Sequence, residues 1–339
     1  MSSRSSRSST PRTPPTPPTP LTQARHPGKP PLSLAAALVF AAIVALGIPP
    51  SLQALEFDRQ FGEASYKFLK LPLSPRVVAL GGAGVALADG AGEIDLNPAA
   101  PAADSGHLVL GKGYPFSEFQ ANTSHITWSI PSRGYRILIN ARYLGFDDIP
   151  GFSNQDRATS DYGAHTLKAQ AGAAGTYRRL QWGATLGFAN NSIANASYSS
   201  AMVNVGAHYP VIAGLAAGAS IVNADFWTSD AKDKENASPF PPTAVQAGLA
   251  YTQAFPAEFV GSVAVDARTR NDEEMVWPMG VEVSWKKTLI ARAGFPLAEQ
   301  EPAPAFGLGL QWSLFRFQYA FQSHETLSPA HYWSLDIHY

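Results

Sequence analysis

The stretch VWPMGVEVSWKK, residues 276–287, decides the fold class because its side chains alternate strictly in character. The odd positions are apolar: Trp277, Met279, Val281, Val283 and Trp285. The even positions are small or polar: Pro278, Gly280, Glu282, Ser284 and Lys286. A period of two residues predicts a β-strand with one oily face and one wet face. Residues 135–143 and 315–322 show the same alternation, so the pattern extends along the chain.

Two architectures have strands with two unlike faces, a soluble β-sandwich and an outer-membrane β-barrel. Strand length separates them, because a sandwich strand has about 5 to 6 residues whereas a tilted membrane-crossing strand needs about 9 to 11. The alternating runs here are about 9 to 14 residues long, which meets the membrane requirement. Tryptophans at strand ends, such as Trp128, Trp227 and Trp312, are typical of membrane interfaces. The sequence therefore favours the barrel.

Breaks in the alternation predict a single antiparallel barrel with about fourteen strands. The connections alternate between very short turns and mostly longer polar loops, as expected for a periplasmic and an outer rim. The predicted strands are residues 107–116, 120–131, 135–146, 165–178, 180–193, 198–211, 214–227, 243–255, 258–269, 276–287, 288–296, 304–313, 314–323 and 331–339.

The amino-terminal part of the 339-residue chain has a different composition. Residues 1–30 are rich in Ser, Thr and Pro, with five basic and no acidic residues, which predicts disorder. An apolar run at 32–47 then predicts a signal peptide cut near Ala54, with a retained membrane anchor as the alternative. Without residues 1–54 the chain has 20 basic and 26 acidic residues, so nucleic acid is not an expected partner. The predicted division is 1–54 leader, 55–105 amino-terminal segment and 106–339 barrel.

Residues 65–103 do not alternate and predict a compact plug rather than a strand. This stretch contains Gly81, Gly82 and Gly84, a helix-capable run at 83–88 and a turn at Asn97-Pro98. Small lumen residues, Ala244, Gly248, Ala250 and Ala254, leave room for such a plug. A filled lumen would block diffusion, and a side opening would leave a route for hydrophobic molecules.

The same stretch carries a recognisable set of residues: Tyr66, Phe68, Leu69, Leu71, Pro72, Ser74, Arg76, Ala79, Leu80, Gly81, Gly82, Asn97, Pro98 and Ala99. With these residues it resembles the amino-terminal signature of the PorV/PorQ group of FadL-like outer-membrane barrels, and of its PorQ-like members in particular. The resemblance implies an outer-membrane component of the type IX secretion system that anchors surface partners, with PorZ-, PorU- or PorV-like proteins as partners. The predicted family-motif and plug site consists of Phe68, Leu69, Pro72, Ser74, Arg76, Gly81, Gly82, Asn97 and Pro98.

No motif predicts catalysis, a cofactor or a metal. The Gly82-Ala83-Gly84 run lacks the third glycine and the βαβ context of a dinucleotide loop. The eight histidines show no His-Glu-x-x-His or Cys/His spacing, and the chain has no cysteine. Neither Ser200 with His208 nor Ser323 with His324 has a nucleophile elbow. We expect the wet-face charges to be lumen ion pairs and solvated charges, with the lining of a ligand path as the alternative. These charges are Arg136, Arg142, Lys168, Asp266, Arg268, Glu282, Lys286, Arg292, Arg316 and Asp336.

Three functions are compatible with a non-enzymatic barrel in outer-membrane lipid. The first is a secretion-system scaffold that presents outer loops, chiefly residues 147–164 and 228–242, to partner proteins. The second is a FadL-like transporter of small hydrophobic molecules, and the third is a structural porin that conducts ions.

Overall fold

The structure is a computed structural model that describes residues 66–87, 90–100, 105–116, 121–149, 162–193, 196–229, 240–297, 303–324 and 327–339. The chain divides into two units, Met1–Pro49 and Pro50–Tyr339, and all described residues belong to the second. The predicted leader, residues 1–54, lies outside the described residues.

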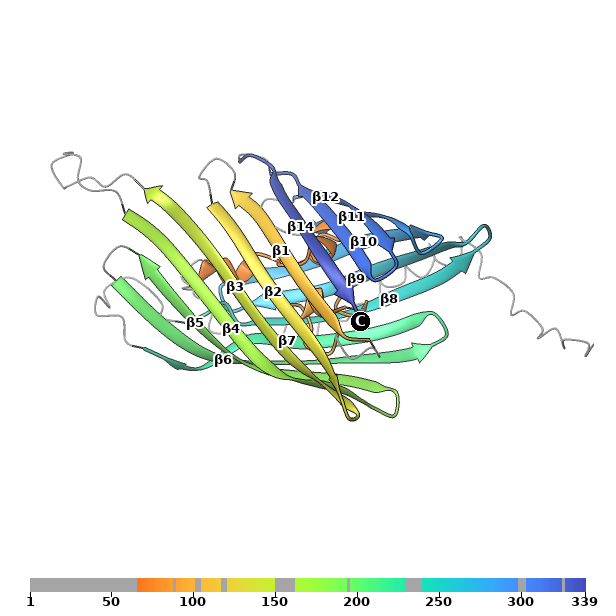
Figure 1. Ribbon diagram of the computed structural model, residues 1–339, viewed down its shortest axis with the longest axis horizontal. Coiled ribbons are helices and arrows are strands. Elements are labelled where there is room, and N and C mark those ends of the chain that lie inside the picture. The colour runs from red at the N-terminus through yellow and green to blue at the C-terminus, as the bar shows by residue number, and fades with distance from the viewer. Residues whose placement is uncertain are drawn as a thin grey trace, which may run out of the picture. The chain divides into compact units, whose positions relative to one another are not determined.

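The described residues form a closed barrel of fourteen antiparallel strands (Figure 1). Each strand pairs with its neighbours in sequence, and β14 pairs back onto β1 from His107↔His338 to Tyr114↔His331. The predicted fold class is confirmed, with strand ends within a few residues of those predicted. The strands are β1 His107–Phe116, β2 Ala121–Ser132, β3 Tyr135–Ile149, β4 Tyr162–Tyr177, β5 Leu180–Ile193, β6 Ala196–Ile212, β7 Leu215–Thr228, β8 Ala244–Phe255, β9 Phe259–Arg270, β10 Glu273–Trp285, β11 Leu289–Leu297, β12 Ala305–Trp312, β13 Phe315–Gln322 and β14 Ala330–His338.

The two ends of the barrel differ in their connections. We call one end the turn rim, made by the short turns at 133–134, 178–179, 213–214, 256–258, 286–288 and 313–314. Both ends of the barrel segment meet at this rim, where Gly106 and Tyr339 exchange backbone hydrogen bonds of 3.0 and 3.1 Å. The opposite end, which carries the remaining connections, is the loop rim.

The outer face of the barrel is apolar and the inner face is polar. Leu186 and Leu308 point outward and are 64% and 63% exposed, whereas Lys168 and Arg142 point inward and are 1% exposed. A closed sheet with an apolar exterior buries that surface in lipid, and a barrel of this kind is the strand-built way to cross a bilayer. The protein is therefore an outer-membrane barrel.

Among the described residues, no helix has both the length and the apolar character required to cross a membrane.

Residues 66–87 and 90–100 lie inside the ring of strands, where Figure 1 shows them in orange. We call the described residues 66–87 and 90–100 the plug. Its regular elements are short: η2 Lys67–Lys70, α2 Pro75–Ala79 and η3 Ala91–Glu93.

Helix α2 begins and ends where local chemistry dictates. The Ser74 hydroxyl accepts a hydrogen bond of 3.2 Å from the Arg76 amide, and Pro75 occupies the first turn. Gly81 and Gly82 follow with φ of +66° and +87°, which ends the helix.

The helix-capable run at 83–88 forms no helix over its described part, residues 83–87. Residues 83–87 form turns, and residue 88 lies outside the described residues. The backbone amides of Gly84 and Val85 are held by the Asp266 carboxylate, at 2.8 and 3.0 Å. Because Gly84 also has a φ of +118°, this stretch cannot continue as a helix.

Candidate functional site

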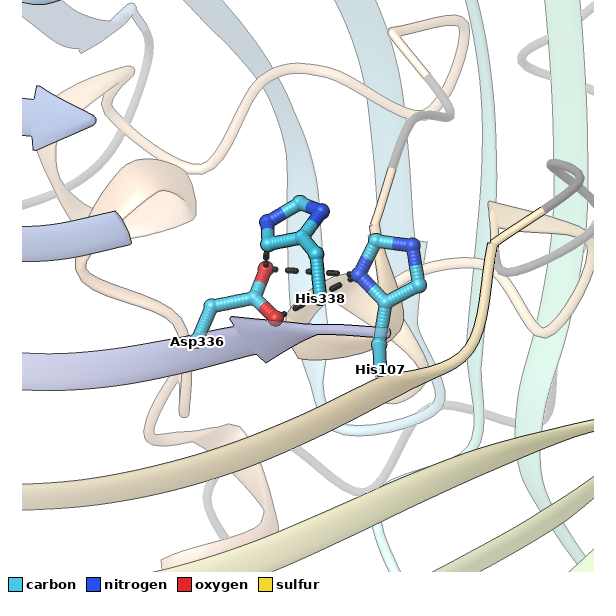
Figure 2. Close-up of side chains that lie close together, drawn as sticks. All are labelled: His107, Asp336 and His338. Atoms are coloured by element: carbon cyan, nitrogen blue, oxygen red, sulfur yellow. Dashed lines mark hydrogen bonds and ion pairs between the residues drawn. The ribbon is translucent and has the colours of Figure 1, made fainter. Parts of the chain in front are cut away.

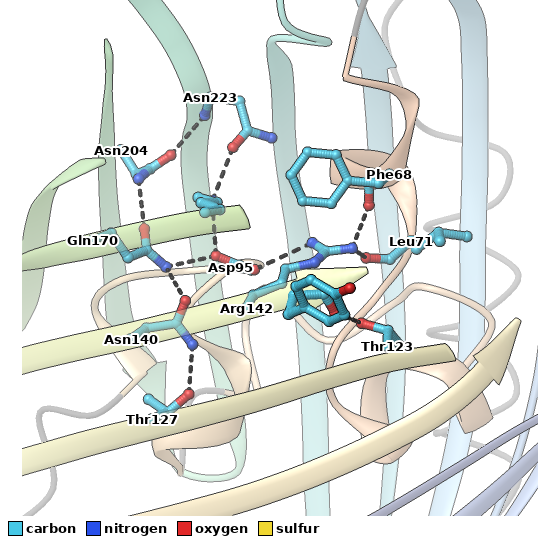
Figure 3. Close-up of polar contacts among 12 residues, drawn as sticks. Phe68, Leu71, Asp95, Thr123, Thr127, Asn140, Arg142, Gln170, Asn204 and Asn223 are labelled. Atoms are coloured by element: carbon cyan, nitrogen blue, oxygen red, sulfur yellow. Dashed lines mark hydrogen bonds and ion pairs between the residues drawn. The ribbon is translucent and has the colours of Figure 1, made fainter. Parts of the chain in front are cut away.

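The contact between plug and barrel wall is organised around Asp95. Its Oδ1 accepts hydrogen bonds from Lys168 Nζ at 2.9 Å and from Gln170 Nε2 at 2.6 Å. Its Oδ2 lies 3.5 Å from a guanidinium nitrogen of Arg142. Figure 3 shows these side chains converging from β3 and β4 on the plug carboxylate. One plug anion therefore neutralises two buried wall cations.

A chain of amides extends this contact around the wall. Gln170 donates to Asn140 at 3.2 Å, and Asn140 donates to Thr127 at 2.8 Å. Gln170 Oε1 accepts from Thr185 at 3.1 Å and from Asn204 at 2.8 Å. These residues come from five successive strands, β2 to β6, so Asp95 is coupled to a large part of the barrel.

Arg142 also fixes the start of the plug. Its guanidinium donates to the carbonyl oxygens of Phe68 and Leu71, the latter at 2.8 Å, and lies 4.9 Å from the centre of the Phe68 ring. Phe68 and Leu69 are buried in a cluster with Leu144 and Met202. The motif residues Phe68 and Leu69 therefore lie against the wall, as a plug requires.

The ionisation of Asp95 is set by this environment. Burial alone would raise the pKa of Asp95, but the charges of Lys168 and Arg142, with hydrogen bonds from Lys168 and Gln170, outweigh it and lower the pKa. Asp95 is thus an anion across the physiological range, which is the state that compensates the two wall cations.

A second ion-pair cluster holds α2. The Arg76 guanidinium binds both Glu282 oxygens, at 2.9 and 3.0 Å, and Glu282 also accepts from Arg292 at 2.6 Å. This two-pronged geometry fixes the guanidinium plane. Ser74 donates to Glu93 at 3.1 Å, linking α2 to η3. The motif residues Ser74 and Arg76 therefore orient the plug rather than line an open site.

Asp266 of β9 binds the backbone of the plug. Besides the Gly84 and Val85 amides, it accepts from Gln246 at 2.7 Å, and Gln246 donates in turn to the Gly82 carbonyl at 3.0 Å. Adjacent amides that point at one carboxylate form an anion-binding nest. The predicted lumen ion pairs are confirmed for Arg142, Lys168, Glu282 and Arg292, but Asp266 serves backbone groups instead.

Asn97 and Pro98 close the far end of the plug. Asn97 Nδ2 donates to the carbonyls of Val85 and Ala207, at 2.9 and 3.1 Å, and Asn97 Oδ1 accepts from the Ala99 amide at 3.0 Å. The side chain therefore joins two parts of the plug to β6, which explains why an Asn-Pro turn suits this position.

Strand glycines mark the places where plug and wall touch, and sequence reasoning missed this. A Cβ at Gly183 would collide with Pro98, and a Cβ at Gly206 with Asn97. Val85 would block a side chain at Gly218, and Leu80 would block one at Gly280 or Gly294. Glycine within a strand is a signal of close backbone approach, so the positions could have been found. The plug residue that each glycine contacts could not be found from the sequence.

The first serine–histidine pair considered in the sequence, Ser200 with His208, is separated along β6. Ser200 Oγ accepts a hydrogen bond of 3.2 Å from Thr228 Oγ1 near the loop rim, whereas His208 lies in the half of β6 near the turn rim.

A cavity of about 220 Å³ remains between the plug and the wall. Its lining is mixed. The apolar side chains are Leu69, Leu71, Pro72, Leu73, Val77, Val78, Leu96 and Val222, and the charged ones are Lys70, Glu93, Asp95, Arg268, Arg270 and Glu273. It reaches the place where the β7–β8 register ends, at Val222↔Ala244, although β7 itself continues to Thr228. The cavity therefore lies beside the point where the pairing of these two wall strands ends.

No protein-family model matches the sequence, and no curated protein is recognisably similar to it. The structure is similar to three solved outer-membrane proteins. The Pseudomonas putida toluene transporter TodX has a TM-score of 0.53 and 12% identity, and the match covers 83% of this chain and 98% of that chain. The Ralstonia pickettii toluene transporter TbuX has a TM-score of 0.52 and 12% identity, with 78% of this chain and 97% of that chain covered. The CymD monoaromatic hydrocarbon channel has a TM-score of 0.52 and 13% identity, with 78% of this chain and 96% of that chain covered. At this identity the similarity establishes the fold alone. The FadL-like barrel fold is confirmed, and the PorV/PorQ group stays a prediction.

Changing Gly81 to valine should displace the plug. Gly81 has a φ of +66° and lies against the Phe295 backbone, so a side chain would meet both conformational strain and a collision. We expect poor barrel assembly or ion leak in planar bilayers. Gly134→Val is the matched control, because Gly134 has a φ of +82° but open space around it. Equal behaviour of the two variants would contradict the plug contact.

Asp95 should make plug docking sensitive to acid. Because its pKa is lowered in the folded state, its contribution is present above its ordinary pKa of 3.8 and is lost as pH falls further. Conductance measured from pH 7 downward should rise below about pH 4. Asp95→Asn should leak already at pH 7, since removing one partner of a buried pair costs about 3–5 kcal/mol. Glu258→Gln, an exposed change at the turn rim, should behave as wild type.

Proposed function

We propose that this barrel carries small hydrophobic molecules across the outer membrane, through the cavity between plug and wall, without chemical change. The observation that carries the proposal is the cavity itself. A dry cavity of about 150 Å³ is enough to bind benzene, and the volume here is about 220 Å³. The space therefore fits a molecule of one aromatic ring.

The position of the cavity suits this role. Lys70, which lines it, forms ion pairs with Asp272 and Glu273 at the loop rim, the latter at 2.8 Å. The end of the β7–β8 pairing, at Val222 and Ala244, also lines the cavity. A hydrophobic molecule that enters from the loop rim would reach lipid sooner through the wall than through the anchored plug.

The similarity in fold to TodX, TbuX and CymD supports the same reading. Two of those proteins are toluene transporters and the third is a monoaromatic hydrocarbon channel. The fold does not determine the cargo, so the substrate class rests on the size and lining of the cavity.

Filling the cavity should stop transport without disturbing the barrel. Val222→Trp places a large side chain in the cavity, and Val283→Trp places the same side chain on the lipid face, where Val283 is exposed. The assay measures toluene uptake by liposomes that contain the barrel. We expect the wild type and Val283→Trp to take up toluene faster than vesicles without protein. In Val222→Trp this increase in uptake rate should be at least about 10-fold smaller, which corresponds to about 1.4 kcal/mol. Wild-type uptake no faster than that of empty vesicles would overturn the proposal.

A second candidate is the secretion-system scaffold, favoured by the PorV/PorQ-like run at residues 71–82. In this role the firmly bound plug keeps the lumen shut while the outer loops bind PorZ-, PorU- or PorV-like partners. Deleting residues 228–242, of which 230–239 lie outside the described residues, should release a surface partner in a pull-down while the barrel still assembles. Retention of every partner would count against the scaffold, and uptake of toluene by the same deletion variant would favour transport.

A further inference from the structure

Closure of the barrel brings together two histidines and an aspartate from opposite ends of the strand sequence. His107 on β1 is the register partner of His338 on β14. Asp336 lies two residues before His338 and therefore on the same inward face. Figure 2 shows the two rings and the carboxylate facing one another at the turn rim. Two imidazoles and one carboxylate are a common donor set for transition metals.

The donor atoms are within hydrogen-bond distance of one another, and their spacing also fits that of metal ligands. Asp336 Oδ2 lies 3.4 Å from His107 Nδ1 and 3.3 Å from His338 Nε2. Charge-assisted N–H···O bonds are shorter, at about 2.7–2.9 Å. Ligand atoms around a tetrahedral zinc ion with bonds of about 2.0–2.1 Å are about 3.3–3.4 Å apart. The three donors all lie within 4.8 Å of one another, so small side-chain rotations complete the set.

The surroundings of the cluster also fit a metal. The other ring nitrogen of His107 lies 3.0 Å from the Ser105 hydroxyl, and the Ser105 carbonyl accepts from Arg136. Metal-binding histidines are usually held by such a second contact. When His107 Nε2 donates to Ser105, Nδ1 turns its lone pair toward the carboxylate, which is repulsive unless a cation lies between them.

The arginine that lies opposite Asp336 on the next strand contacts a different residue. Arg316 of β13 is the register partner of Asp336, but its Nε donates to Gln311 at 3.1 Å. His107 and Asp336 are buried, while the His338 side chain is 17% exposed. A metal ion can therefore reach the cluster from the turn rim, and a water molecule can fill the fourth position.

We propose that His107, Asp336 and His338 bind a divalent transition metal ion, of the zinc type, that links the first and last strands of the barrel. Every other pair of neighbouring strands is consecutive in the chain, whereas β1 and β14 are the first and last strands of the barrel. A metal ion at this position would connect β1 to β14, the pair of neighbouring strands that no turn or loop links directly.

The test is a titration of the purified full-length barrel in detergent, stripped with a chelator and then given Zn²⁺ alone or Co²⁺ alone. We expect one Zn²⁺ per chain by calorimetry, a visible absorption band of tetrahedral Co²⁺, and a raised urea midpoint when Zn²⁺ is present. Ser105→Ala should weaken binding by about 10-fold, as loss of an outer-shell partner does. Failure of the wild-type barrel to bind stoichiometric Zn²⁺ would overturn the proposal.

Variants locate the site. His107→Gln, His338→Gln and Asp336→Asn should each lose the Co²⁺ band and the effect of Zn²⁺ on the urea midpoint. His331→Gln is the matched control on the same strand, because His331 lies at the other end of β14 and contacts Tyr319. Heat-dependent gel migration shows which variants are folded. Unchanged Zn²⁺ binding in any folded ligand variant, or equal loss in His331→Gln, would contradict the assignment.

Discussion

The structure depends on pairing buried charge inside a closed wall. Arg142 and Lys168 point into the lumen and are almost completely buried, and an unpaired ion in such a place costs several kcal/mol. Asp95 of the plug supplies the anion that these two cations need. Arg76 of the plug and Glu282 of β10 form a second ion pair between plug and wall. The plug is therefore part of the stable barrel, and the wall is incomplete without it.

Steric contacts and charges act together. Wall glycines let the backbone of the plug approach the strands where no side chain would fit, as at Gly206 and Gly294. The polar contacts then fix its register, because each carboxylate or amide meets a specific backbone group or side chain. A cavity of about 220 Å³ remains between plug and wall, beside the point where the pairing of β7 with β8 ends. Its place in the lumen, rather than any reactive group, supports a transport function.

Alternation of polarity was enough to predict the strands, because a period of two is a local property that survives in a lipid-facing sheet. The plug was also predictable as the stretch that does not alternate, but its partners were not. Asp95 and Arg142 are far apart in sequence, and nothing local marks them as a pair. The same holds for His107 and His338, which are separated by almost the whole barrel and meet only because β14 pairs with β1. The helix-capable residues 83–87 form turns instead, because Asp266, a distant residue, binds that backbone.

A cross-link between plug and wall tests the central claim most directly. The chain has no cysteine, so a pair of introduced cysteines gives an unambiguous signal. A Cβ at Gly82 would lie 3.8 Å from the Cβ of Pro278, and disulfides have a mean Cβ–Cβ distance of about 3.8 Å. The barrel carrying Gly82→Cys and Pro278→Cys should oxidise fully to an intramolecular disulfide in the outer membrane. Two free thiols in the assembled, oxidised barrel would show that the plug does not lie against β10, and would contradict the account.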